Sequence, residues 1–83
     1  MTDREIILEA IKDERIRQDY LWGDQSGHAD EYWVAILAEE VGEAAKEVLH
    51  KDTIKLFVEL TQVAAVTVQW MEALLKRAAN TTE

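Results

Sequence analysis

The sequence contains no cysteine and no proline, and only three of its 83 residues are glycine. The lack of cysteine excludes a disulfide framework, a thiolate metal site and a cysteine nucleophile. Two of the glycines, Gly23 and Gly27, fall in one polar segment, which predicts a loop over residues 21–29. A domain this short buries a smaller fraction of its surface than a large one does. Its stability must therefore come from packing, from association or from binding of a hard metal ion.

Positive charge is also scarce. Nine Lys and Arg residues stand against 17 Asp and Glu residues, which gives a formal net charge of −8. Binding to DNA or to anionic lipid depends on a basic surface, so the composition disfavours a nucleic-acid or membrane partner. A strongly acidic chain is better suited to binding divalent cations.

Long apolar runs are missing as well. Asp3, Arg4 and Glu5 precede the first apolar cluster, and no uninterrupted apolar segment typical of a signal peptide follows. The most apolar stretch, residues 56–71, includes Glu59 and is shorter than the about 20 apolar residues of a bilayer span. We therefore expect a soluble, cytoplasmic protein without a transmembrane segment.

Apolar residues recur at helical spacing through most of the chain, and the alternation typical of strands is absent. This pattern predicts one all-α domain over residues 1–83, with helices at about 3–20, 30–50 and 53–78. Asp30 is the expected N-cap of the second helix, and Asp52 or Thr53 that of the third. Because only residues 51–53 separate these helices, they should form an antiparallel helical hairpin, to which the N-terminal helix is added.

The second and third helices distribute their apolar residues differently. The second has one apolar face, bordered by an acidic stripe. The face consists of Val34, Leu37, Val41, Ala45 and Val48, and the stripe of Glu40, Glu43 and Glu47. The third helix points apolar side chains in nearly every direction, so it has to be buried on all sides. Two other helices of one short chain do not cover it, and we therefore expect a homodimer that forms a four-helix-type bundle, or a homotetramer.

The acidic residues of the hairpin are expected to meet in one layer. Glu59 is the only charged residue in the apolar stretch of the third helix, and burial of an isolated carboxylate is strongly unfavourable. If the hairpin turns near Lys51, residues equally far from it lie at one level, so that Glu43 faces Glu59 and Glu40 faces Gln62. Such a cluster takes up protons, pairs with bases or binds a cation. Oxygen ligands alone favour Mg²⁺ or Mn²⁺.

A solvated helix face is a simpler explanation for some of these acids. Glu43 has Lys46, and Glu47 has Lys51, at the spacing of intrahelical ion pairs. Glu39 is open to the same interpretation. It does not account for Glu59, which makes that residue the informative one.

The acidic motifs resemble those of the MazG-like, all-α nucleoside triphosphate pyrophosphohydrolases, which carry EExxE on one helix and ExxD on the next. The corresponding segments here are Glu39-Glu40-Val41-Gly42-Glu43 and Glu59-Leu60-Thr61-Gln62. Small stand-alone members of the family are similar over roughly residues 14–75. The similarity includes Glu14-Arg15-Ile16-Arg17-Gln18, Trp22-Gly23, Gln25, His28, Trp33, Ile36-Leu37 and Val63-Ala64-Ala65-Val66.

The resemblance implies hydrolysis of a (deoxy)nucleoside triphosphate between its α and β phosphates, which releases a monophosphate and pyrophosphate. It implies that Glu40, Glu43 and Glu59 hold Mg²⁺, and that Glu39 holds a second ion or orients the attacking water. Gln62 departs from the family motif, which has Asp at this position. The carbonyl oxygen of a glutamine can still bind a metal ion, but it brings no negative charge.

Candidate substrate-binding residues have weaker signals. Arg17 and Lys46 fit phosphate contacts, although surface ion pairs suit them equally well. Trp22 and Trp33 fit stacking on a base, whereas their positions at helix boundaries favour packing against the core. Gln25 and His28 lie in the loop that resembles the substrate side of the family. We include all of these except Trp33, which we assign to the core, among the candidate substrate-binding residues.

Two other classes of protein were weighed against this interpretation. In a non-catalytic interaction module, the apolar third helix mediates assembly and the acids form a vestigial or structural metal site, which Gln62 and the small size favour. A carboxylate-bridged di-iron bundle requires Glu-x-x-His pairs, and neither histidine follows a glutamate at that spacing. The first alternative stays open, and the second is excluded.

Overall fold

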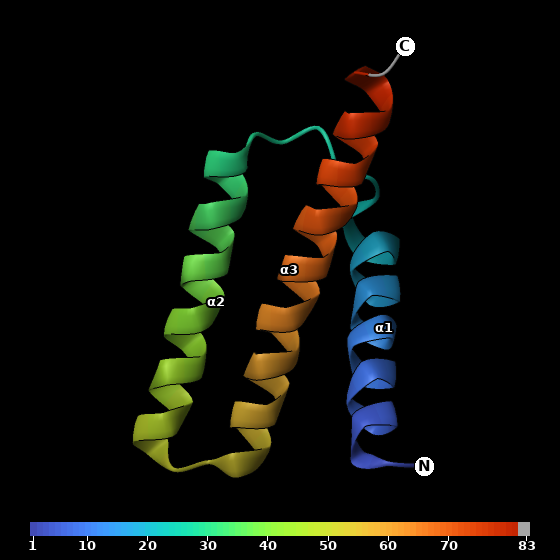
Figure 1. Cartoon of the computed structure of the whole chain (residues 1–83). Coiled ribbons are helices and arrows are strands. Elements are labelled where there is room, and N and C mark those ends of the chain that lie inside the picture. Colours follow the sequence, from blue (N-terminus) through green and yellow to red (C-terminus); the bar gives the residue numbers. More distant parts are fainter. Residues whose placement is uncertain (82–83) are drawn as a thin grey trace.

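The computed structural model describes residues 1–81, and this part of the chain is helical with no strand, as predicted. Its helices are α1 (Asp3–Trp22), α2 (Asp30–His50) and α3 (Thr53–Thr81). Helices α2 and α3 form the expected antiparallel hairpin, and α1 lies along the other side of α3 (Figure 1). None of the helices in residues 1–81 combines the length and the apolar character that a membrane span requires.

Helix α1 has a well-defined start and end. The Thr2 hydroxyl accepts a hydrogen bond from the Glu5 backbone N–H at 3.1 Å, and the Glu5 carboxylate accepts one from the Thr2 N–H at 3.2 Å. This reciprocal capping box satisfies two backbone donors at the helix start. At the other end, Gly23 has a φ of 68°, a backbone conformation that glycine adopts without steric cost. The helix therefore runs two residues past the predicted end at Tyr20.

The N-cap predicted for α2 is wrong. Ala29 occupies the N-cap position without a side-chain hydrogen bond, and Asp30 is the first helical residue. The carboxylate of Asp30 instead accepts hydrogen bonds from α3, at 3.0 Å from Trp70 Nε1 and at 2.9 and 3.1 Å from Arg77. A tertiary interaction thus replaces the local one, and it ties the start of α2 to the far half of α3.

The connection between α2 and α3 is one residue shorter than predicted. It consists of Lys51, which is in the left-handed conformation with a φ of 56°, and Asp52. The Asp52 carboxylate accepts a hydrogen bond from the Lys55 backbone N–H at 2.9 Å, so the prediction of Asp52 as a cap is confirmed. Helix α3 continues past the predicted end near Ala78 and is helical through Thr81, the last residue that the structure describes.

The core lies between α2 and α3. Trp33, Val66 and Ala73 form its centre, and Ile36, Leu37 and Trp70 pack against them. Of the face of α2 predicted to be apolar, Leu37 packs against the core, whereas Val34, Val41 and Val48 are 54%, 50% and 58% exposed. The side of α2 that meets α3 is therefore rotated away from most of the predicted face. The buried residues of α2 are Trp33 and Ala44, and Glu40 and Glu47 are partly buried. Two of the acids therefore lie in the seam of the hairpin.

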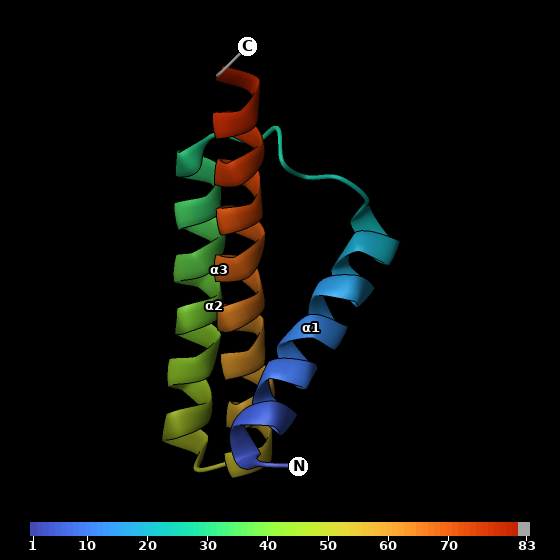
Figure 2. The ribbon, with the colours of Figure 1, turned by 45° about the vertical axis from the view of Figure 1, so that its right-hand side comes forward.

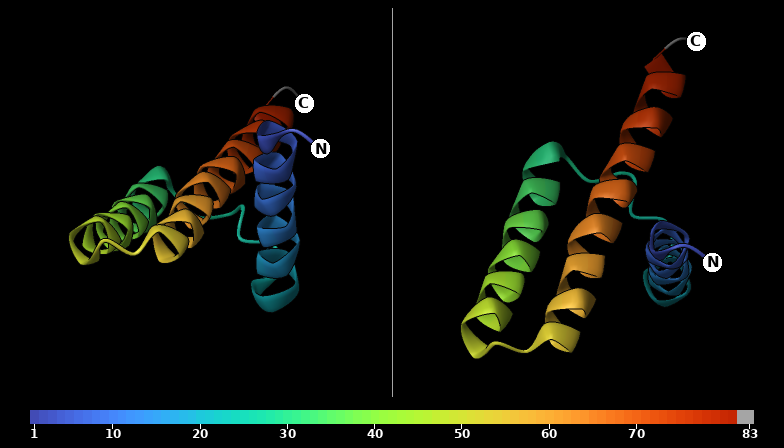
Figure 3. Two further views of the ribbon diagram at one scale, coloured as in Figure 1. Left: turned by 90° about the horizontal axis from the view of Figure 1, so that it is seen from below. Right: turned by 60° about the horizontal axis from the view of Figure 1, so that its bottom comes forward.

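Helix α1 is inclined to the hairpin (Figures 2 and 3). It packs against α3, and among residues 1–81 no Cα atom of α1 comes within 8 Å of one in α2. The one residue of α1 that is fully buried is Gln18, at 4% exposure. The backbones of α1 and α2 thus lie apart on two sides of α3, and side chains of all three helices line one cleft.

Candidate functional site

A cleft of about 280 Å³ lies between the end of α1, the following loop and the hairpin. Its lining combines aromatic and aliphatic side chains, two acids and four amides. These residues are Gln18, Trp22, Gln25, Tyr32, Trp33, Ile36, Glu39, Glu40, Gln62, Val66 and Gln69. Small-molecule sites typically combine such an apolar wall with a few polar groups. Among the candidate site residues, Trp22, Gln25, Glu39, Glu40 and Gln62 line it.

Carboxylates gather around Glu40. Burial raises its pKa above the ordinary glutamate value, and the negative charges of Glu59, Glu39, Glu43 and Glu14 raise it further. The side chains of Glu39, Glu40 and Glu59 form no ion pair with Lys or Arg in residues 1–81. No three Asp, Glu, His or Cys side chains in this part of the chain lie close enough together to hold a metal ion as they stand.

Glu43 and Glu47, the other two acids of the predicted stripe, have local partners. Glu43 is 48% exposed and lies 3.8 Å from Lys46, which is itself 59% exposed. Glu47 is 13% exposed and lies 3.8 Å from His50 in the last turn of α2. The structure therefore places Lys46 on the outer surface, away from the lining of the cleft, and Glu47 is more buried than a solvated helix face requires.

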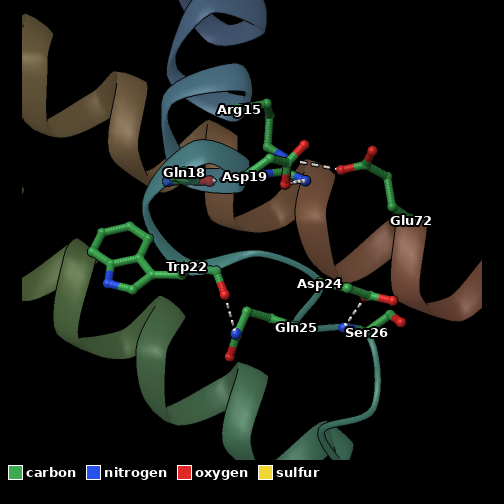
Figure 4. Close-up of polar contacts among 8 residues, drawn as sticks. All are labelled: Arg15, Gln18, Asp19, Trp22, Asp24, Gln25, Ser26 and Glu72. Carbon is green, nitrogen blue, oxygen red and sulfur yellow. Dashed lines mark hydrogen bonds and ion pairs between the residues drawn. The ribbon is translucent and has the colours of Figure 1, made fainter.

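Gln62 takes part in an amide network between α1 and α3. Its Oε1 accepts a hydrogen bond from Gln18 Nε2 at 3.4 Å. The buried Gln18 accepts in turn from Arg15 Nη1 at 3.1 Å. Arg15 is held from the other side by Glu72 of α3, at 2.7 Å, and by Asp19, at 2.9 Å (Figure 4). A continuous chain of hydrogen bonds thus leads from the outer surface to the floor of the cleft.

Glu14 is a partly buried acid of α1 beside the cleft lining, and the sequence pattern did not single it out. Its side chain is only 10% exposed. Burial by itself raises the pKa of Glu14, but hydrogen bonds from Arg17, Gln62 and Gln18 outweigh this effect and lower the pKa below its ordinary value. The signal in the sequence was the spacing of Glu14 and Gln18 by four residues, which places them on one face of the helix.

Arg17 binds this carboxylate with two hydrogen bonds, Nε to Oε1 at 2.9 Å and Nη2 to Oε2 at 3.1 Å. Its side chain is 54% exposed and does not line the cleft. The structure thus places this candidate phosphate ligand at the edge of the site, bound to Glu14.

Aromatic side chains form the other end of the cleft. The Trp22 indole is 60% exposed, so its predicted packing in the core is wrong, whereas Trp33 at 2% exposure confirms the same prediction. His28 stacks on Tyr32 with ring centroids 3.7 Å apart, and its Nε2 lies 2.9 Å from Gln25 Oε1. Gln25 Nε2 donates to the carbonyl oxygen of Trp22 at 2.8 Å. The two hydrogen bonds of Gln25 therefore connect it to Trp22 on one side and to His28 on the other.

A second hollow, of about 410 Å³, lies on the other side of the end of α1. Its cations are matched by acids. Arg15 pairs with Glu72 and Asp19, and Lys76 pairs with Asp24, whose carboxylate also accepts from the Ser26 N–H (Figure 4). The hydrogen bond from Lys76 holds the pKa of Asp24 far below its ordinary value. These ion pairs hold the loop and α1 against α3. The carboxylates without a basic partner, Glu39 and Glu40, line the first cleft instead.

Comparison of the chain with protein-family models, with curated proteins and with solved structures finds no match.

Proposed function

We propose that this protein is a metal-dependent nucleotide pyrophosphohydrolase of the MazG-like kind, which converts (deoxy)nucleoside triphosphates into monophosphates and pyrophosphate. The observation that carries the proposal is the composition of one cleft, in which two carboxylates of an acidic cluster lie beside three aromatic rings and four amides. A nucleotide has the matching chemistry, because a base stacks on rings and pairs with amides while its phosphates require cations.

The electrostatics explain why a metal ion is needed. Glu39, Glu40 and Glu59 have no ion pair with Lys or Arg in the described part of the chain, and a triphosphate brings further negative charge into a protein whose net charge is already −8. Carboxylate oxygens are the donors that Mg²⁺ and Mn²⁺ prefer, so the donor set fits such an ion. When bound, the metal ion neutralises phosphate charge and lowers the pKa of water.

The roles of the residues follow from their positions. We assign Glu40, Glu43 and Glu59 to metal binding, with Gln62 beside them, and Glu39 at the exposed rim to orienting the attacking water. At the other end, Trp22 offers its exposed indole to a base. Gln25 lies beside it in the cleft lining and His28 contacts Gln25. Arg17 and Lys46, which pair with Glu14 and Glu43, are the cations that we assign to phosphate oxygens. The protein is proposed to act in the cytoplasm as a soluble enzyme.

We also propose that the enzyme is a homodimer or homotetramer built on the hairpin. The chain exposes 6206 Å², whereas a compact monomer of 9.5 kDa exposes roughly 5,000 Å². The excess is comparable to the about 800 Å² that each partner buries in a standard interface. Exposed apolar residues along α3 provide the surface. They include Phe57, Leu60, Val68, Met71 and Leu75.

A non-catalytic helical module with a vestigial metal site is the second candidate. The observation that favours it is the same apolar surface, together with the lack of a ready metal-binding group among residues 1–81. The two candidates differ in whether nucleotide is consumed.

The test is incubation of the purified protein with a panel of nucleoside triphosphates and Mg²⁺ or Mn²⁺, followed by measurement of pyrophosphate. We expect metal-dependent release of pyrophosphate and not of phosphate. Glu40→Gln and Glu59→Gln should each lower the rate by about two orders of magnitude or more, since each removes a charged ligand. Glu9→Gln, which neutralises an exposed acid of α1, is the matched control. Absence of pyrophosphate with every nucleotide would leave the interaction module as the better explanation.

A further inference from the structure

We infer that Tyr32 of α2 is a base-stacking residue of the cleft. In this arrangement His28 and Gln25 are positioning residues, which fix the Tyr32 ring and its neighbour Trp22. The inference rests on the proposed function and adds to it. It predicts that the cleft binds the base of a nucleoside monophosphate, a product of the proposed reaction, without a metal ion.

The ring of Tyr32 is held in place by two neighbouring rings. The imidazole of His28 stacks on it, with ring centroids 3.7 Å apart and an angle of 15° between the planes. The indole of Trp33, which is 2% exposed, lies nearly perpendicular to it at a centroid distance of 5.3 Å. Both are arrangements that aromatic pairs favour. The phenol ring is therefore oriented before any ligand binds, which lowers the cost of binding.

The cleft lies on the side of the Tyr32 ring that His28 leaves uncovered. Tyr32 is 39% exposed and lines the cleft together with Trp22, whereas His28 does not line it. The stacked imidazole is thus turned away from the cleft. No other ring in residues 1–81 stacks on Tyr32. A planar base that enters the cleft can therefore extend the stack, with Tyr32 between the base and His28.

Gln25 connects the two ends of this aromatic surface through hydrogen bonds of fixed direction. Its Nε2 donates to the Trp22 carbonyl oxygen at 2.8 Å (Figure 4). A carbonyl oxygen only accepts, so this bond sets the orientation of the amide. The Gln25 Oε1 then accepts from His28 Nε2, 2.9 Å away, which places an imidazole proton on Nε2. One side chain therefore couples the ring behind Tyr32 to the residue with the exposed indole.

Stacking on this surface does not depend on the metal ion of the proposed reaction. Trp22 and Tyr32 are uncharged, and every base has a π face that stacks on an aromatic ring. The carboxylates of Glu39 and Glu40 line the same cleft and repel phosphate. A monophosphate carries less charge than a triphosphate, so it is the better probe of the aromatic surface in metal-free protein.

The test is calorimetric titration of the full chain in EDTA with the monophosphates of the common bases, and with ribose 5-phosphate as the probe that lacks a base. At least one monophosphate should bind about tenfold or more tighter than ribose 5-phosphate. Tyr32→Leu removes the ring and should weaken that binding by roughly tenfold or more. Tyr32→Phe keeps the ring and should retain most of the affinity. The matched control is Tyr20→Leu, at a tyrosine of α1 that is 89% exposed and outside the cleft lining.

Two variants of His28 test its role as a positioning residue. His28→Ala removes the ring behind Tyr32 and should weaken monophosphate binding less than Tyr32→Leu does. His28→Phe restores a ring without the hydrogen bond to Gln25, so it should recover most of the loss. In wild type, the base protons should show nuclear Overhauser effects to the Tyr32 ring. This measurement needs no variant and decides the question if Tyr32→Leu folds poorly.

Three results would overturn the inference. They are wild type that binds no monophosphate better than ribose 5-phosphate, folded Tyr32→Leu that binds as wild type does, and a bound base without an Overhauser effect to Tyr32. None of them decides the proposed function, which release of pyrophosphate with metal tests separately. Monophosphate binding that depends on Tyr32, without release of pyrophosphate, would instead support the inference for a nucleotide-binding protein that is not an enzyme.

Discussion

At the scale of single residues, the most informative side chain is a glutamine. Gln18 is 4% exposed, yet it belongs to a polar chain that includes Arg15, Gln62 and Glu14. Each side of its amide has a partner, so its burial carries no penalty for an unmade hydrogen bond. An apolar residue would pack equally well in this position. The amide is therefore better explained by the orientation that it imposes on its neighbours.

The Gln18–Gln62 pair should behave as one energetic unit. Gln18→Leu leaves the Gln62 carbonyl oxygen without its donor, and Gln62→Leu leaves the Gln18 amide without its acceptor. We expect each single variant to lower the free energy of unfolding by about 1–3 kcal/mol in metal-free protein. The double variant should cost less than the two together, by about 1 kcal/mol. Urea denaturation measures the cycle, and strictly additive values would contradict a direct bond.

At the scale of the helices, the sequence pattern predicted the existence of each element and the hairpin but not all of the faces. Hydrophobic periodicity selects the most apolar arc of α2, which contains Val34, Val41 and Val48, and this arc points away from α3. Periodicity measures how apolar a face is and not which partner it meets. The side of α2 that faces α3 includes Trp33 and the partly buried Glu40. Burial of a carboxylate is unfavourable, so the amino-acid types alone do not predict that this side is the inner one.

The candidate site was predictable only where the hairpin fixes the geometry. A short turn sets which residues of α2 and α3 share a level, and this argument placed Glu40 opposite Gln62 and Glu43 opposite Glu59. Glu40 and Gln62 do line the same cleft, and the charge of Glu59 acts on Glu40. Nothing comparable fixes the register of α1, because a seven-residue loop intervenes between Trp22 and Asp30. The burial of Glu14 beside Gln18 was therefore not predictable from the sequence. Asp30 was misassigned for a related reason, since its partners are remote in sequence.

The ion pair of Asp30 should make stability depend on pH. Hydrogen bonds from Arg77 and Trp70 lower the pKa of Asp30 below its ordinary value of about 3.9. In the folded state the carboxylate thus stays charged to lower pH than in the unfolded state. Its contribution is present above the ordinary value and is lost as the pH falls through the lower, folded value.

The expected result is that Asp30→Asn lowers the melting temperature at pH 7 and that the difference from wild type shrinks as the pH falls below 4. The loss should be modest because the pair is exposed. Asp13→Asn, which neutralises an exposed acid of α1, should show no such convergence. Melting curves between pH 2 and 7 provide the measurement. A deficit that persists unchanged in acid would mean that Asp30 acts through packing.

At the scale of the whole molecule, partly buried acids lie beside the apolar core of the hairpin, while other apolar residues are exposed on its outer surface. The inward side of the hairpin holds Glu40, Glu47 and Glu59 in partial burial, while valines and leucines face outward. In a fold driven by apolar burial alone, the exposed valines and leucines would be buried and the acids exposed. The observed arrangement is consistent with an outer surface that another copy covers and with acids that bind a cation.

Met71→Glu tests the proposed assembly. It places a charge among the exposed apolar residues of α3, where it is harmless to a monomer and unfavourable inside an interface. Sedimentation of wild type at micromolar concentration should give a mass at least twice the 9.5 kDa of the chain. The variant should shift toward the monomer. Lys12→Glu, at an exposed position of α1, is the matched control. A folded wild-type monomer would contradict the proposal.

The way in which α1 is attached divides the molecule into two cooperative units. Helices α2 and α3 share the apolar core, whereas the fully buried residue that α1 contributes is an amide, and ion pairs such as Arg15–Glu72 surround it. Salt weakens exposed ion pairs, and apolar packing does not share this sensitivity. Local opening follows the weakest set of contacts. Helix α1, and with it one wall of the cleft, therefore detaches from α3 before the hairpin opens, and ionic strength sets how often it does so.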